Sequence, residues 1–80
     1  MKNAEIARMF DTMADIMEIQ GENPFRVNSY RKVARIIGDM AEDIEAVARQ
    51  QGLTSLPGIG DSSAQKIEQY LKSGRMDAYD

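Results

Sequence analysis

Cysteine and histidine are both absent from this chain of 80 residues. Their absence excludes disulfides, thiolate zinc sites and acid–base catalysis by imidazole, and it favours a cytosolic compartment. No apolar run approaches the roughly 20 residues that span a membrane, and the start lacks a signal-peptide pattern. The sequence therefore predicts a cytoplasmic protein with no membrane partner.

Basic charge is scarce as well, since the net charge is −3. Affinity for nucleic acid comes mainly from neutralising phosphates, so this balance opposes strong DNA binding. The cations are grouped, however. Residues 26–35 hold four cations and no acid, and residues 66–75 hold three cations and one acid. We therefore expect one basic face on an acidic chain, with weak and salt-sensitive binding.

The apolar residues follow a helical period along nearly the whole chain, and strand signals are missing. Eighty residues make one small domain, so the sequence predicts a compact all-α domain of four helices over residues 1–80. The expected helices run from Asn3 to about residue 20, from Pro24 to Ile37, from Asp39 to near Gln51, and from Asp61 or Ser62 to Ser73.

Capping residues set these boundaries. Asn3 is expected to cap the first helix, Asn23 the second, Asp39 (with Glu42 three residues later) the third, and Asp61 or Ser62 the fourth. Gly21, Gly38, Gly52 and Gly74 are expected to stop them. The expected inward residues are Ile6, Met9, Phe10, Met13, Ile16 and Met17; Val27, Tyr30, Val33, Ala34 and Ile37; Met40, Ile44 and Val47; and Ala64, Ile67 and Leu71.

Residues 56–60 read Leu-Pro-Gly-Ile-Gly, and an amphipathic helix follows them. Two glycines one residue apart let the backbone turn tightly and approach a ligand closely. The first amides of the following helix have no intrahelical partners and carry the positive end of the helix dipole. This pattern predicts an anion site, with a nucleic-acid backbone phosphate as the expected anion. The candidate binding residues here are Pro57, Gly58, Ile59, Gly60, Ser62 and Ser63.

These glycines have two other interpretations. A dinucleotide-binding loop is disfavoured, because a hydrophobic strand before the glycines and a third glycine after them are both missing. A glycine-capped loop between two helices that binds nothing stays open as an alternative. Leu56, Pro57, Ala64 and Ile67 favour the binding interpretation, because their spacing resembles the helix-hairpin-helix motif, a DNA-binding unit without sequence specificity, over about residues 53–74.

Nearly the whole chain resembles the N-terminal helical domain (the 8-kDa domain) of the family X DNA polymerases, the polymerase beta group, in its bacterial and archaeal form. The segments that carry this resemblance are Asn3-Ala4-Glu5-Ile6-Ala7, Gly21-Glu22-Asn23-Pro24-Phe25-Arg26, Ser29-Tyr30-Arg31-Lys32, the hairpin, and residues 66–75.

The resemblance implies a function in DNA repair. In that family the domain binds the 5′-phosphate on the downstream side of a DNA gap, and in some members it also excises a 5′-deoxyribose phosphate during base excision repair. Arg26 matches a basic residue on the 5′-phosphate, and Phe25 matches a histidine that stacks on a DNA base. Arg31 adds to the basic segment. Lys66 matches the Schiff-base nucleophile of the lyase, and Tyr30 a tyrosine beside it.

The chain departs from the lyase-active members at three positions. Thr54, Asp61 and Ser62 stand where those members carry basic residues. Asp61 would repel a phosphate, and as a helix N-cap it would occupy the amides that a phosphate needs. A helical scaffold or protein-interaction domain that has lost DNA binding is therefore a further alternative, beside the lyase.

The resemblance also implies a monovalent cation, Na⁺ or K⁺, at the carbonyls of Thr54, Leu56 and Ile59, and no other cofactor. The paired aspartates that hold two metals in a polymerase palm are missing from this sequence. We therefore expect the polymerase domains of a longer protein as partners, although a stand-alone relative is the alternative. The other expected partner is gapped, 5′-phosphorylated DNA, bound by a monomer.

Overall fold

The computed structural model describes residues 1–77 and 79, and over these residues it is built from helices and turns without a strand. The predicted all-α fold class is confirmed. Residues 78 and 80 of the predicted domain lie outside the described residues. The elements are α1 (Asn3–Ile19), α2 (Pro24–Asp39), α3 (Ile44–Gln50), the 3₁₀ turn η1 (Leu53–Ser55) and α4 (Asp61–Ser73).

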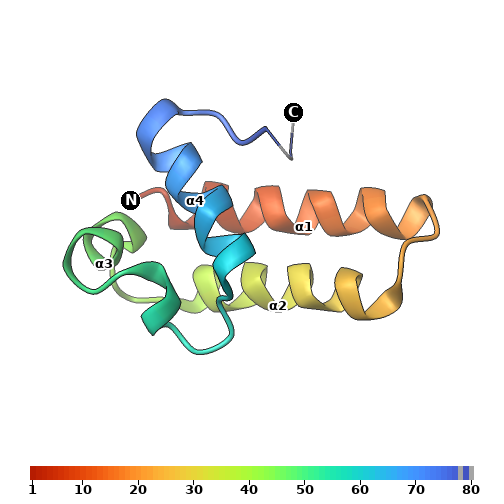
Figure 1. Ribbon diagram of the computed structural model, residues 1–80, viewed down its shortest axis with the longest axis horizontal. Coiled ribbons are helices and arrows are strands. Elements are labelled where there is room, and N and C mark those ends of the chain that lie inside the picture. The colour runs from red at the N-terminus through yellow and green to blue at the C-terminus, as the bar shows by residue number, and fades with distance from the viewer. Residues whose placement is uncertain (78, 80) are drawn as a thin grey trace.

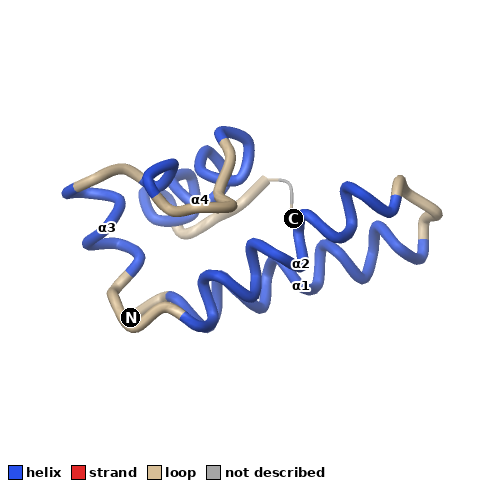
Figure 2. Tube along the Cα trace, turned by 90° about the horizontal axis from the view of Figure 1, so that it is seen from below, coloured by secondary structure: helices blue, strands red, loops and turns tan. Residues whose placement is uncertain are grey.

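The helices form two layers. The two long helices, α1 and α2, lie side by side and antiparallel, and α4 crosses them (Figure 1). Seen from below, α4 lies on one side of the α1–α2 pair, with α3 beyond one end of that pair (Figure 2). Within the described part of the chain, each helix is too short or too polar to span a bilayer.

The hydrophobic core fills the space between these layers. Every expected inward residue of α2 is buried, from Val27 to Ile37. The prediction for Ile16 is wrong, because this residue near the end of α1 is 45% exposed. Helical periodicity predicts which face is apolar, but the far end of α1 extends past the helix that covers that face. Three buried residues that the periodicity missed lie outside the α-helices, namely Leu53, Ile59 and Met76.

Asn23 caps α2 as predicted. Its side chain accepts a hydrogen bond from the amide of Phe25 at 2.8 Å, and Pro24 is the first helical residue. The predicted cap for α1 is wrong. Asn3 is already inside α1, where it is buried; its amide group donates to the carbonyl of Glu42 at 2.7 Å and accepts from the amide of Ile44 at 3.0 Å. Asn3 thus joins the start of α1 to the start of α3.

The predicted start of α3 is also wrong. Asp39 is the last residue of α2, so α2 continues past Gly38 and its end falls later than predicted. The cap of α3 is Asp43, whose carboxylate accepts from the amide of Glu45 at 3.0 Å. Glycine is weakly helical rather than forbidden in a helix, so packing against α1 can carry α2 across Gly38.

Candidate nucleic-acid interface

The hairpin between η1 and α4 packs against the rest of the domain through Ile59 and Gly58. Ile59 points into the core and is 4% exposed, and its amide donates to the carbonyl of Leu56 at 3.1 Å. Gly58 has a φ of +92°, a region that side chains disfavour. A Cβ at Gly58 would lie only 2.6 Å from Cδ1 of Ile36 on α2. The hairpin therefore packs on α2 through Gly58, where any larger residue would strain the backbone and displace the Ile36 side chain.

The N-terminus of α4 carries no side-chain cap. Gly60 occupies the cap position in an extended conformation, and a capping side-chain hydrogen bond is missing there. The prediction that Asp61 or Ser62 caps this helix is wrong, because Asp61 is already its first helical residue. The amides of the first turn, at residues 61–63, therefore keep their donors available to a ligand.

These amides border a depression of about 660 Å³ between the start of α2, the hairpin and the start of α4. We call it the α2–hairpin depression. It gathers most of the sequence-predicted phosphate ligands from two distant parts of the chain. Its lining residues are Glu22, Asn23, Phe25, Arg26, Ser29 and Tyr30 from the α2 side, and Gly58, Gly60, Asp61, Ser62 and Ser63 from the hairpin and α4.

Sequence reasoning missed part of this lining and included residues that lie elsewhere. Ser29 was missed, although it lies three residues after Arg26 and so on the same face of α2. Pro57 and Ile59, both predicted ligands, are outside the lining, and Ile59 is instead part of the core.

Arg26 supplies the positive charge of the depression. Its side chain is exposed, and the ion pairs among the described residues do not include it. Glu22 and Asp61 place two carboxylates in the same lining, where they oppose an anion. One unpaired guanidinium and the N-terminus of α4 therefore attract an anion to the depression, and two carboxylates repel it.

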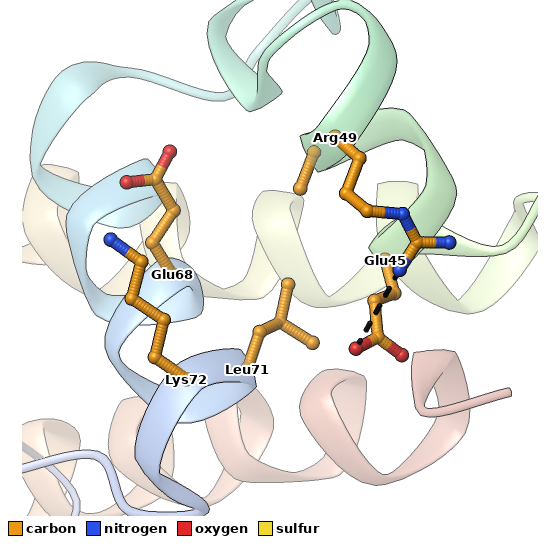
Figure 3. A pocket seen from close by; sticks show the side chains of 6 residues that line it. Glu45, Arg49, Glu68, Leu71 and Lys72 are labelled. Carbon is orange, nitrogen blue, oxygen red and sulfur yellow. Dashed lines mark ion pairs between the residues drawn. The ribbon is translucent and has the colours of Figure 1, made fainter.

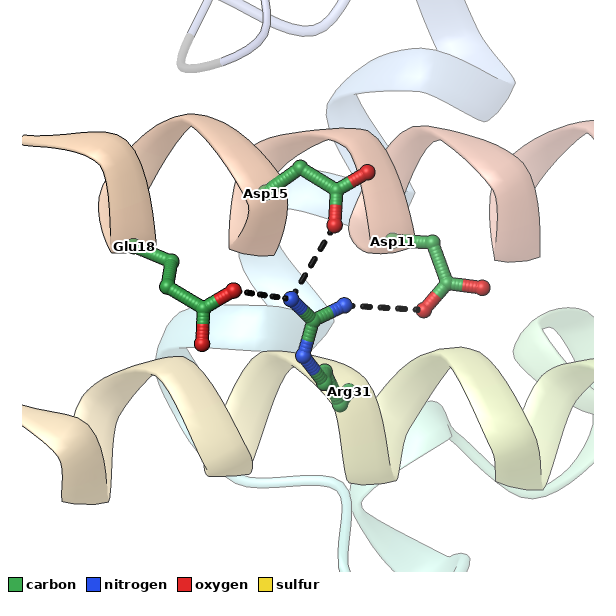
Figure 4. Close-up of polar contacts among 4 residues, drawn as sticks. All are labelled: Asp11, Asp15, Glu18 and Arg31. Carbon is green, nitrogen blue, oxygen red and sulfur yellow. Dashed lines mark hydrogen bonds and ion pairs between the residues drawn. The ribbon is translucent and has the colours of Figure 1, made fainter.

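Arg31 has a different environment, although it is on the same helix. Its guanidinium contacts three carboxylates of α1, those of Asp15 at 3.0 Å, Glu18 at 3.2 Å and Asp11 at 4.0 Å (Figure 4). The hydrogen bond to Asp15 is the main reason that the pKa of Arg31 is raised above its ordinary value. Arg31 is not among the residues that line the depression. It joins α2 to α1, and its predicted role on DNA stays a prediction.

Lys66, on α4, lies next to Tyr30 and Ser62. Its Nζ donates to Oγ of Ser62 at 2.8 Å and lies 5.8 Å from the centre of the Tyr30 ring. A second hollow of about 400 Å³ contains Lys66 and shares Arg26 and Tyr30 with the α2–hairpin depression. The amine therefore lies next to two residues, Tyr30 and Ser62, that line the α2–hairpin depression.

A groove of about 330 Å³ lies between α3 and α4 (Figure 3), and Lys66 is not among the residues that line it. Its lining holds charges of both signs, and the guanidinium of Arg49 pairs with the carboxylate of Glu45 at 4.0 Å. Glu68 lies in this groove, so within the described residues Lys66 pairs with Ser62 rather than with Glu68. Two acids, Glu45 and Glu68, offset the two cations of the lining, Arg49 and Lys72, and this balance disfavours a phosphate.

The monovalent cation predicted at the hairpin stays a prediction. The Leu56 carbonyl accepts one hydrogen bond, from Ile59, and a carbonyl oxygen has a second lone pair. A cluster of three or more acidic side chains that could hold a metal is missing from the described residues. The carbonyls of Thr54, Leu56 and Ile59 stay the predicted cation ligands.

Comparisons with known proteins identify the family of this chain. A family model described as a helix-hairpin-helix domain matches residues 1–76. The chain belongs to this family. It is also similar to DNA polymerase/3′-5′ exonuclease PolX of Bacillus subtilis (strain 168), with 32% identity over 75 residues. The match covers 94% of this chain and 13% of that relative, so the helix-hairpin-helix domain spans a small part of its length. The resemblance to the helix-hairpin-helix domain of family X polymerases is thereby confirmed.

Proposed function

We propose that this helix-hairpin-helix domain binds gapped DNA without sequence preference, and that the α2–hairpin depression receives the 5′-phosphate of the downstream strand. Membership of the family and similarity to a polymerase support DNA binding at a general level. We further propose that the domain anchors the polymerase domains of a larger protein on damaged DNA. The observation that carries the finer proposal is the meeting of Arg26 with the uncapped start of α4 in one depression.

The chemistry of the depression suits a terminal phosphate. Backbone amides at a helix N-terminus bind anions through hydrogen bonds and the helix dipole, and a guanidinium adds charge-assisted hydrogen bonds. Phe25, which is 85% exposed at the edge of the depression, offers a ring on which an unpaired base can stack. Glu22 and Asp61 reduce the attraction, so binding is weak and falls steeply with salt.

Fluorescence anisotropy on one-nucleotide-gapped DNA tests this proposal. At low salt we expect the duplex with a downstream 5′-phosphate to bind roughly tenfold more tightly than the same duplex with a 5′-hydroxyl, because charge-assisted contacts contribute about 1.5–3 kcal/mol. Equal affinity for the two duplexes would contradict the phosphate site. A lack of binding to both would support the scaffold alternative instead.

A second candidate function, 5′-deoxyribose-phosphate lyase, is favoured by the position of Lys66 beside Tyr30 and the depression. Its unprotonated amine would attack the sugar aldehyde at C1′ and form an imine with loss of water. Loss of a C2′ proton then breaks the C3′–O bond, which leaves a 5′-phosphate on the DNA, and water hydrolyses the imine to release the sugar.

Trapping with borohydride tests the lyase on incised abasic DNA, because borohydride reduces the imine to a stable amine adduct. We expect a covalent adduct with the wild-type chain and none with Lys66→Ala. Lys72→Ala is the matched control, since Lys72 lies on the same helix in the α3–α4 groove, and it should keep the adduct. An undiminished adduct in Lys66→Ala would assign the nucleophile to another amine.

A further inference from the structure

One lysine at the hairpin lies outside the lining of the depression. A Cβ at Gly58 would be 3.2 Å from Cε of Lys32 and 3.8 Å from its Nζ. The end of the Lys32 side chain therefore lies close to the backbone of Gly58, in space that a side chain at this position would narrow. The alkyl part of Lys32 thus lies over the hairpin backbone. A lysine chain held in this way keeps its ammonium group in water, at a defined position.

The charge of Lys32 has no partner in the part of the chain that the structure describes. Lys32 is exposed, and the ion pairs among residues 1–77 and 79 do not include it. Its neighbour Arg31, in contrast, contacts three carboxylates of α1. The two adjacent cations therefore have different environments. Arg31 joins α2 to α1, and Lys32 faces solvent beside the hairpin.

We propose that Lys32 binds a second backbone phosphate of the same DNA, next to the phosphate in the α2–hairpin depression. This inference rests on the proposed function. Gly58 connects the two positions, because it lines the depression with Arg26 and a Cβ built on it would lie 3.2 Å from Cε of Lys32. Arg26 and Lys32 are six residues apart, about 9 Å along the helix at 1.5 Å per residue. With this offset, we expect the two side chains to contact different phosphates of one strand.

Lys32→Met tests this inference, since methionine keeps an unbranched apolar chain over Gly58 and removes the charge. Affinity for 5′-phosphorylated gapped DNA is measured by anisotropy from 50 to 200 mM salt. The slope of log affinity against log salt should become shallower by about 0.9, with a roughly tenfold loss of affinity at 50 mM salt. Lys72→Met, which makes the same change of net charge in the α3–α4 groove, should leave the slope unchanged.

The preference for the 5′-phosphate separates this inference from the proposed function. Lys32→Met should keep the wild-type ratio of affinities for the 5′-phosphate and the 5′-hydroxyl, because Lys32 contacts an internal phosphate that both duplexes share. Suppose that the wild-type chain prefers the 5′-phosphate, but Lys32→Met and Lys72→Met have equal slopes of log affinity against log salt. This result would overturn the role of Lys32 and leave the 5′-phosphate site intact. Absence of the preference in the wild-type chain would overturn the phosphate site itself, and with it this inference.

Discussion

Replacing Gly58 with alanine is expected to destabilise the domain and to abolish most of its DNA binding. The backbone at this position has a φ of +92°, which costs a side chain about 1–3 kcal/mol. The added methyl would also lie 2.6 Å from Cδ1 of Ile36, so that side chain would have to rotate away. We expect a total loss of about 2–3 kcal/mol, which lowers the melting temperature of a domain of this size by about 10 °C or more.

DNA binding should fall together with stability in Gly58→Ala. Relief of the backbone strain at residue 58 would change the hairpin conformation, and this change would displace the amides at the start of α4 relative to Arg26. We expect the affinity for 5′-phosphorylated gapped DNA, measured well below the melting temperature, to fall more than tenfold, since binding of the phosphate needs both groups together.

Gly60→Ala is the matched control within the same motif. Gly60 has an ordinary φ of −86°, and a Cβ there would have no atom within 4 Å. The loss of stability should stay below about 1 kcal/mol, the usual difference between glycine and alanine at a helix N-cap. Circular dichroism melts of the two variants give the comparison. Equal melting temperatures for Gly58→Ala and the wild-type chain would refute the packing argument at the hairpin.

Arg26→Met is expected to remove the preference for a 5′-phosphate without destabilising the fold. Arg26 is exposed and unpaired among the described residues, so its loss breaks no ion pair that supports the helices. In the proposed complex it donates charge-assisted hydrogen bonds to the terminal phosphate. The ratio of affinities for 5′-phosphate and 5′-hydroxyl duplexes should therefore fall from roughly ten to near one.

Arg31→Met makes the same chemical change five residues further along α2 and should give the opposite result. It leaves Asp11, Asp15 and Glu18 close together on α1 without a cation. We expect a lower melting temperature, most clearly at low salt where repulsion is least screened, and an unchanged 5′-phosphate preference. If Arg31→Met removed the preference and Arg26→Met kept it, the phosphate site would have to move to the Arg31 side of α2.

Local sequence signals predicted the presence and the apolar faces of the helices better than the residues at which the helices begin and end. The core face of α2 follows from periodicity alone, and Asn23 followed by Pro24 marks the start of α2 because the cap and the proline act on adjacent backbone groups. The predicted cap of α3 was wrong because packing carries α2 through Asp39. The predicted cap of α1 was wrong because the side chain of Asn3 accepts the amide of Ile44, 41 residues away. Such a partner exists only once α1 and α3 have packed together.

The sequence by itself determined the all-α class, the family and the glycine hairpin, because these depend on residue spacing along one stretch of chain. The tertiary structure alone decided which cations are available to a ligand. Arg26, Arg31 and Lys32 are equivalent in a charge count, yet packing against α1 pairs Arg31 with three acids. Packing against the hairpin leaves Arg26 at the depression and Lys32 beside Gly58. The physical reason is that pairing depends on which charges the packed helices bring within about 4 Å of one another.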